Sequence, residues 1–209
     1  MDTVTFYFSF RSPYAWLAYY RLAAVLERLP IRVDRVPVFP PPNFPNDPAA
    51  VPAKLQYLKQ DVERTAAAYG LSVQWPRTTD TAWMRPHAAY LYGADQQQGD
   101  AFALQAYAAR FSHGRDLGAD DTLRQVAGAC QLDAAAVVRA ADDPSMHERV
   151  RHGLQQAMQH GIFGVPTFIY GGQIYWGNDR IEWLLRAVQL RTGQAVPNLE
   201  RDLLARPCL

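Results

Sequence analysis

Two proline-containing segments, far apart in the chain, carry the residue types best suited to bind or activate an anion. The first is Ser12-Pro13-Tyr14-Ala15, in which Ser12 is a typical N-cap and Pro13 a typical first residue of a helix. The backbone N–H groups at a helix start lack partners within the helix and lie at the positive end of its dipole. This segment therefore predicts an anion-binding site, to which the Ser12 hydroxyl adds a donor.

The second segment, Gly164-Val165-Pro166-Thr167, precedes a short apolar stretch. A cis bond between Val165 and Pro166 would leave the N–H and C=O of Val165 free to pair with an extended, peptide-like ligand. A trans Pro166 that opens an edge strand explains the same residues equally well. Ser12, likewise, can be a helix cap only, and no His or Asp partner that would make it a nucleophile is apparent in the neighbouring sequence.

Composition sets the class of the protein. The chain has 209 residues, of which 49% are hydrophobic and 20% charged, as is ordinary for a soluble globular protein. The net charge is +1, so nothing predicts a nucleic-acid or membrane partner. We find neither a signal-peptide pattern nor an apolar run of about 18 residues, and therefore expect a cytoplasmic location.

Cysteine and histidine spacing predicts neither a disulfide nor a metal centre. Cys130 and Cys208 are far apart and fit no metal or redox motif. The five histidines show no ligand spacing, because His147 and His152 are five residues apart and lack a third partner. We therefore expect no bound metal.

The hydrophobic pattern begins as strand, helix, strand and then becomes helical. Strands are expected at residues 4–10 and 31–38, on either side of a helix over 13–29 that Pro30 ends. This order predicts a parallel βαβ unit, which a proline-rich loop then leaves. The helices expected after this loop span residues 52–69, 84–97, 100–112, 120–129, 133–141 and 146–160.

Strand signals return near the end of the chain. Residues 166–170 and 173–176 are expected to form a hairpin through Gly171-Gly172, followed by a helix over 180–191. Asn178 or Asp179 would cap that helix. The amides of this helix start could bind the carboxylate of an amino-acid head group, and Asp179 its ammonium group.

The order βαβ, helical insert, ββα predicts an α/β thioredoxin-like fold with an inserted all-helical domain. Residues 1–45 and 161–209 would form the thioredoxin-like domain, and residues 46–160 the insertion. Such a fold places the start of the first helix beside the Val165-Pro166 loop. A redox protein of this fold carries Cys-x-x-Cys at the helix start, where this chain has Ser12 and Ala15. We therefore expect the site to hold a thiolate that belongs to another molecule.

Four sequence segments form a combined pattern: FYFSFRSPYAWLA (residues 6–18), KLQYLKQD (54–61), GVPT (164–167) and WGNDR (176–180). Together they resemble the 2-hydroxychromene-2-carboxylate isomerase family, which is related to the kappa-class glutathione transferases. The resemblance implies a homodimer that binds glutathione, with the glutathione thiolate near a catalytic Ser12, and that acts on a small aromatic acid.

The same resemblance implies further roles in binding glutathione. Asn46 and Lys54 would reach its glycine end, although Asn43 competes with Asn46, and Lys54 and Tyr57 also fit a solvated helix face. The remaining implied residues are Tyr57 and Trp75 at the sulfur and substrate cavity, Val165 and Pro166 along the cysteinyl backbone, and Asn178 and Asp179 at the γ-glutamyl end. Candidates for an aromatic-acid pocket, or equally for core, are Tyr14, Trp16, Trp75 and Trp83.

Three functions fit these residues. The first is a glutathione-dependent isomerase of aromatic catabolism, in which glutathione is the nucleophile. The second is a kappa-like glutathione transferase or peroxidase that uses the same site. The third is a non-catalytic thioredoxin-fold binding protein.

Overall fold

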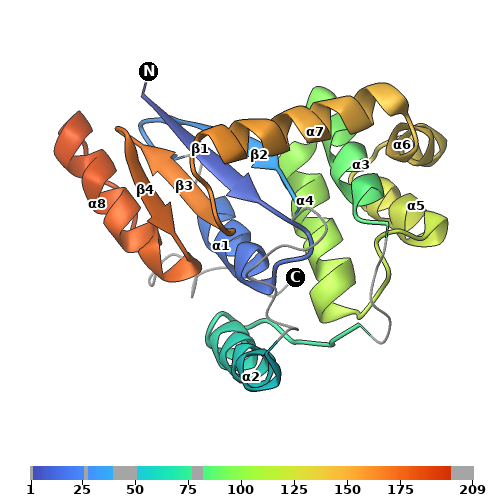
Figure 1. Ribbon diagram of the computed structural model, residues 1–209, viewed down its shortest axis with the longest axis horizontal. Coiled ribbons are helices and arrows are strands. Elements are labelled where there is room, and N and C mark those ends of the chain that lie inside the picture. Colours follow the sequence, from blue (N-terminus) through green and yellow to red (C-terminus); the bar gives the residue numbers. More distant parts are fainter. Residues whose placement is uncertain (1, 26–27, 40–50, 77–81, 199–209) are drawn as a thin grey trace.

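A four-stranded mixed sheet forms the centre of the computed structural model, which describes residues 2–25, 28–39, 51–76 and 82–198 (Figure 1). The strand order is β2-β1-β3-β4. β1 (Thr3–Phe8) pairs parallel with β2 (Arg32–Pro37) and antiparallel with β3 (Thr167–Tyr170), and β3 pairs antiparallel with β4 (Gln173–Trp176). This topology confirms the expected α/β thioredoxin-like fold, in which the two ends of the chain share one sheet.

Helices account for most of the other described residues, in the order that the hydrophobic pattern predicts. α1 (Pro13–Ala23) joins β1 to β2, and the described residues between β2 and β3 contain no strand. The boundary expected at residues 45 and 46 lies outside the described residues, so the division into two domains stays a prediction. The other helical elements are α2 (Pro52–Ala68), α3 (Met84–Asp95), α4 (Gly99–Tyr107), η3 (Ala108–Ser112), α5 (Asp120–Ala129), α6 (Ala134–Ala141), α7 (Pro144–Gln159), η4 (Asn178–Arg180) and α8 (Ile181–Thr192).

Two helices end earlier than their patterns predict. α1 ends at Ala23 rather than near residue 29, because the next amides bond three residues back: Val25 N–H donates to Leu22 O at 2.8 Å. α4 ends at Tyr107 and continues as the π-helical segment η3. There the N–H of His113 donates to Ala108 O, five residues back, at 3.0 Å. The spacing of apolar residues does not reveal where the backbone hydrogen bonds change from the α-helical pattern to a three-residue or five-residue one.

Aromatic side chains join the sheet to the helices in one hydrophobic core. Phe6 stacks on Phe168 of β3 with ring centroids 4.5 Å apart. Phe8 lies on the same face of β1, and its ring centroid is 5.0 Å from that of Tyr90 in α3. One buried cluster therefore includes β1, β3, α1, α8 and the helices of the long insertion.

α7 covers the other face of the sheet (Figure 1). Tyr7 is fully buried there against Ala157, and its hydroxyl lies 2.7 Å from His160 Nδ1. The helix approaches β2 closely at Gly153. A Cβ at this glycine would lie 2.9 Å from Val36 Cγ1 and 3.3 Å from Pro37 O. The absence of a side chain at position 153 therefore sets the distance between α7 and the sheet.

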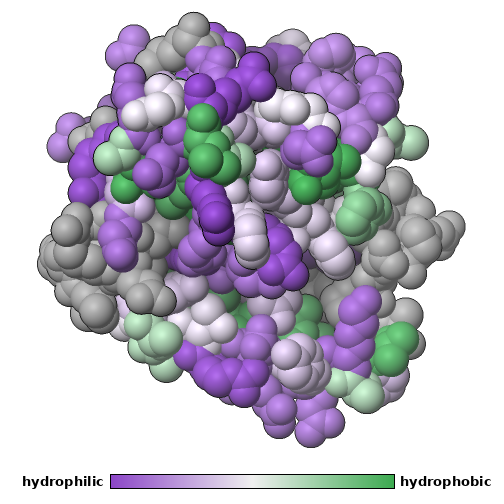
Figure 2. Space-filling view, turned by 90° about the vertical axis from the view of Figure 1, so that its left-hand side faces the viewer, coloured by the Kyte–Doolittle hydropathy of each residue, from purple (hydrophilic) through white to green (hydrophobic). Residues whose placement is uncertain are grey.

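Large apolar side chains on the α8 side of the molecule are scattered. Trp183 and Leu190 are exposed on α8, but Figure 2 shows apolar patches on this face separated by polar residues. Single exposed apolar residues of this kind are normal for a folded chain. None of the helices in the described ranges combines the length and apolar character that a membrane span requires.

We expect Gly153→Ala to destabilise the protein by about 1–3 kcal/mol, because the new methyl group would force α7 away from Val36 and Pro37. The matched control is Gly128→Ala in α5, where nothing lies within 4 Å of an added Cβ. That variant should be neutral, or more stable by up to about 1 kcal/mol, because alanine favours helix. Urea unfolding measures both free energies, and equal effects at the two positions would contradict the close contact.

Candidate functional site

Ser12 and the Val165–Pro166 segment are in direct contact. Ser12 has extended backbone angles (φ −93°, ψ 116°), and its Oγ accepts a hydrogen bond from Ala15 N at 3.2 Å, as expected of an N-cap. The same hydroxyl donates to Val165 O at 3.3 Å. The Val165–Pro166 peptide bond is cis. The expected juxtaposition is therefore present, but the Val165 carbonyl already accepts a bond from Ser12 and is not free.

A hollow of about 940 Å³ opens beside this contact, between α1, α2 and the start of α8. Its volume is in the range of small-molecule binding sites. Five of the residues expected to bind glutathione line it: Tyr57, Val165, Pro166, Asn178 and Asp179. The other lining residues are Tyr14, Arg21, Asp61, Thr65, Ala68, Tyr69, Trp176, Gly177, Arg180 and Glu182.

The other expected binding residues lie outside the lining of this hollow. Lys54 is exposed on the first turn of α2. Trp75 is partly buried against Phe111, and its Nε1–H donates to Glu63 Oε1 at 2.6 Å. Asn46 and its alternative Asn43 are not among the described residues. The roles of these residues in binding remain predictions.

The turn from residue 177 to residue 180 is fastened to the cis-proline loop. Gly177 N–H donates to Pro166 O at 2.9 Å. Gly177 has a φ of +116°, which L side chains rarely adopt, and an added Cβ would collide with Asp179 Oδ1. This glycine therefore lets the chain pass from β4 into η4 with Asn178 and Asp179 at the wall of the hollow.

Asp61 is a lining residue that the sequence interpretation did not single out. The Tyr14 hydroxyl donates to Asp61 Oδ2 at 2.7 Å and so links α1 to α2. Burial and the Asp61 bond raise the pKa of Tyr14, and the Arg64 hydrogen bond lowers the pKa of Asp61. Tyr14 therefore stays protonated and Asp61 charged at neutral pH. The available signal was helical spacing, since Tyr57, Asp61 and Thr65 are each four residues apart.

A buried histidine holds the backbone just before Ser12. His87, on α3, has Nδ1 2.5 Å from Trp83 O, so Nδ1 carries the proton and donates. Its Nε2 then accepts from Phe10 N–H at 3.2 Å and from the Ser9 hydroxyl at 3.3 Å. The sequence interpretation considered His87 only as a metal ligand and missed this role, which no spacing in the sequence indicates.

The carbonyl of Ser9 is also held in place. It accepts from the Tyr107 hydroxyl at 3.0 Å and from Ser12 N–H at 3.0 Å. Tyr107 is the last residue of α4. Two helices of the long insertion therefore fix the loop that carries Ser12.

Of the aromatic candidates, Tyr14 lines the hollow whereas Trp16 belongs to the core. Trp16 is 2% exposed and stacks on Phe111 with ring centroids 5.3 Å apart. Trp83 is partly buried, with the Arg110 guanidinium 4.7 Å from its ring. In the described part of the chain, the four aromatic candidates therefore do not form one cavity wall.

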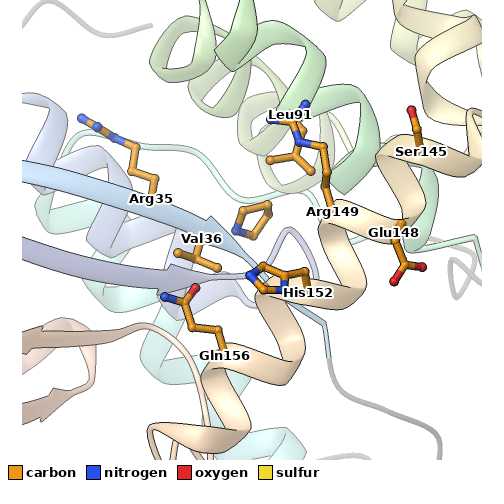
Figure 3. Close-up of a pocket in the computed structure, with 10 residues that line it drawn as sticks. Arg35, Val36, Leu91, Ser145, Glu148, Arg149, His152 and Gln156 are labelled. Atoms are coloured by element: carbon orange, nitrogen blue, oxygen red, sulfur yellow. The ribbon is translucent and has the colours of Figure 1, made fainter.

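A second hollow, of about 620 Å³, lies between β2 and α7 (Figure 3). Val36, His152 and Gln156 point into it. Its arginines are already paired, Arg35 with Asp100 and Arg149 with Asp95. The two hollows share none of their described lining residues, and the motifs around Ser12, Val165 and Asn178 all meet at the first.

The described residues offer no substitute for the missing redox cysteine. Cys130 is buried at the end of α5, where burial raises the pKa of its thiol to about 11. The thiol is therefore protonated at neutral pH and is a poor nucleophile. Within the described ranges, no three His, Cys, Asp or Glu side chains are close enough together to hold a metal ion.

Comparison with known proteins agrees with this geometry. Residues 3–189 match the family model of the DsbA-like thioredoxin domain. The chain is 32% identical to 2-hydroxychromene-2-carboxylate isomerase of Sphingobium xenophagum over 190 residues, which is 87% of this chain and 95% of the relative. The chain belongs to the 2-hydroxychromene-2-carboxylate isomerase family, on a DsbA-like thioredoxin fold. This confirms the resemblance stated from the sequence, and the protein is an enzyme of the isomerase type.

Further relatives extend the comparison. The isomerase of Pseudomonas putida is 27% identical over 191 residues, covering 88% of this chain and 93% of the relative. A solved 2-hydroxychromene-2-carboxylate isomerase has a TM-score of 0.79 at 23% identity, over 92% of this chain and 99% of the other. A cytosolic disulfide reductase, DsbM from Pseudomonas aeruginosa, solved with GSH, has a TM-score of 0.65 at 16% identity, over 90% and 99% of the two chains. Likenesses at these low identities show the shared fold.

The buried His87 predicts a loss of stability in mild acid. Burial lowers its pKa from 6.5 to about 4, so the unfolded chain binds a proton more readily between these values. The stabilisation is complete above pH 6.5 and is lost as the pH falls toward 4. We expect the free energy of unfolding of the wild type to drop by roughly 3 kcal/mol more than that of His87→Gln between pH 7 and pH 4. Urea titrations at each pH measure the difference, and parallel profiles for the two proteins would contradict it.

Proposed function

We propose that this protein is a glutathione-dependent isomerase that acts on 2-hydroxychromene-2-carboxylate or a closely related aromatic acid. The observation that carries the proposal is the contact between Ser12 and the cis-proline segment, whose residues Val165 and Pro166 line a hollow of about 940 Å³. The curated relatives, which this chain matches over almost their whole length, support the reaction type.

The residues around the hollow fit glutathione. The tripeptide has a carboxylate at each end, an ammonium group at its γ-glutamyl end and a thiol in the middle. The hollow adjoins two helix starts, at α1 and at η4, and such ends favour anions. Asp61 and Asp179 add carboxylates that suit an ammonium group. The walls of the hollow therefore offer groups that suit the carboxylates of glutathione and groups that suit its ammonium.

Glutathione bound in the hollow would supply a thiolate nucleophile, whose reversible addition to an electrophilic carbon of the substrate would permit ring opening and bond rotation. The protein's own part is to place this sulfur and to lower its pKa. The bond from the Ser12 hydroxyl to Val165 O is long, at 3.3 Å, so the hydroxyl can turn toward a negatively charged sulfur instead. Such a charge-assisted bond is stronger than the neutral bond it replaces. The positive end of the α1 dipole adds to the effect.

Tyr14 and Tyr57 provide aromatic surface inside the hollow. Both line the hollow, and Tyr57 is more than half exposed, at 59%. A side chain of this kind can cover a flat substrate without a large change in the fold. We propose that these two rings orient the aromatic acid over the Ser12 turn.

We expect Ser12→Ala to reduce kcat/KM for isomerisation by roughly 10- to 1000-fold, because the sulfur loses a hydrogen-bond donor. Glutathione should still bind, with a thiol pKa closer to its value in water. Isomerase assays and ultraviolet titration of the bound thiolate provide the two measurements.

Ser145→Ala is the matched control for this substitution, because Ser145 lies on the first turn of α7 at the other hollow. Thermal melting corrects for the loss of the Ser12 N-cap, which costs about 1 kcal/mol. The cap of α7 is Asp143, so Ser145→Ala removes only the bond from its hydroxyl to that carboxylate. Turnover of Ser12→Ala close to wild type on a confirmed substrate would refute the role of Ser12.

A paired assay separates the isomerase from the other two functions that the sequence allows. With glutathione present, we expect the chromene acid to be isomerised faster than 1-chloro-2,4-dinitrobenzene is conjugated. The reverse preference would favour a kappa-like transferase. Calorimetric titration that detects no glutathione binding would favour a non-catalytic binding protein.

A further inference from the structure

Arg21 is a buried cation at the wall of the hollow. It is not one of the residues that the sequence predicted to bind glutathione. It lies on α1, two turns after the Ser12 cap, and is only 4% exposed. Its Nη1 donates to Asn178 O at 2.6 Å and lies 3.3 Å from Asn178 Oδ1. One side chain therefore binds both the backbone and the side chain of the residue that opens η4.

The surroundings of Arg21 fix its guanidinium group in place. Nη2 pairs with the carboxylate of Glu182, which is about half exposed. The guanidinium carbon lies 5.7 Å from the centre of the Tyr69 ring, and the Tyr69 hydroxyl accepts from Asn178 Nδ2 at 3.3 Å. The Nε of Arg21 is buried and has no hydrogen-bond partner among the described residues. Arg21 is thus held from several sides, with Glu182 as its counter-ion.

The orientation of the η4 turn depends on this arrangement. Gly177 N–H anchors one end of the turn to Pro166 O, and Arg21 anchors the next residue, Asn178, from beneath. The first amides of the turn have no partners inside the helix, and the turn forms a wall of the hollow. Asp179 and Arg180 form an exposed ion pair at 3.3 Å, and Arg21 pairs with Glu182. What Arg21 gives the turn is therefore a fixed position for Asn178.

We propose that Arg21 is a positioning residue that makes the η4 turn specific for an amino-acid carboxylate, namely the α-carboxylate at the γ-glutamyl end of glutathione. The inference rests on the proposed function, and it adds the residue that decides which thiol is accepted. Arg21 acts through Asn178, by holding its peptide group.

The test compares two thiols on wild type and Arg21→Gln by calorimetric titration. Glutathione carries the γ-glutamyl group and cysteinylglycine lacks it. We expect Arg21→Gln to weaken glutathione binding roughly 10- to 100-fold, because a charged hydrogen-bond donor is lost. Cysteinylglycine binding, measured directly or by competition, should change less than about threefold. The ratio of the two dissociation constants is therefore the decisive quantity.

Arg85→Gln is the matched control, because Arg85 is a partly buried arginine that pairs with Asp120 and Asp142 away from this hollow. It should alter neither dissociation constant. If Arg21→Gln does not fold, Arg21→Lys keeps the charge but loses the forked geometry, and it should still narrow the preference for glutathione. Circular dichroism and thermal melting establish that each variant is folded.

The outcomes separate this inference from the function on which it rests. An equal loss for both thiols in a folded Arg21 variant would show a merely structural role and overturn the inference. A wild type that binds no glutathione would overturn the proposed function itself. A selective loss for glutathione, with cysteinylglycine unaffected, would establish Arg21 as the specificity determinant.

Discussion

The fixed backbone between β1 and α1 is the constraint on which the site depends. His87 accepts the Phe10 N–H, and Tyr107 donates to the Ser9 carbonyl, which also accepts the Ser12 N–H. These bonds satisfy polar backbone groups in an apolar region, where leaving them unpaired would be costly. They also set the direction in which α1 begins. The loop is thereby held where the Ser12 hydroxyl meets Val165 O.

The two halves of the site are brought together by strand pairing rather than by local sequence. β1 and β3 are antiparallel neighbours, with Tyr7 opposite Thr167. The pairing places the chain that leaves β1 beside the chain that enters β3. Ser12 and Val165 are 153 residues apart in sequence, yet they are separated by one hydrogen bond in space. Burial of Phe6 against Phe168 stabilises this arrangement from within.

What could be predicted from the sequence follows from the range of the interactions. The Ser12 cap, the hairpin through Gly171 and the apolar strand of β1 are local features, and they were predicted correctly. The early end of α1 was not predicted, because the apolar pattern continues past Ala23 while the backbone hydrogen bonds change from four residues back to three. Arg21 and His87 were missed as functional residues, because their partners lie 157 and 77 residues away. Side-chain bonds over such separations leave no periodic trace in the sequence.

The charges around the candidate site follow a simple division. Helix starts supply positive potential, and Asp61 and Asp179 supply carboxylates on the same walls. Arg64 keeps Asp61 ionised, while Tyr14 stays protonated beside it. The zwitterionic head group that we propose as ligand would meet both signs within one hollow, without a large net charge on the protein.

The single core shared by sheet and helices restricts how such a protein can diversify. Phe8 packs on Tyr90, and Phe10 on Tyr107, so the sheet depends on side chains from the long insertion. The helical stretch is consequently not an exchangeable module, and transplanting it from a relative would leave these rings without matching neighbours. New substrate ranges on this scaffold should therefore arise by stepwise replacement of individual wall residues rather than by recombination of segments.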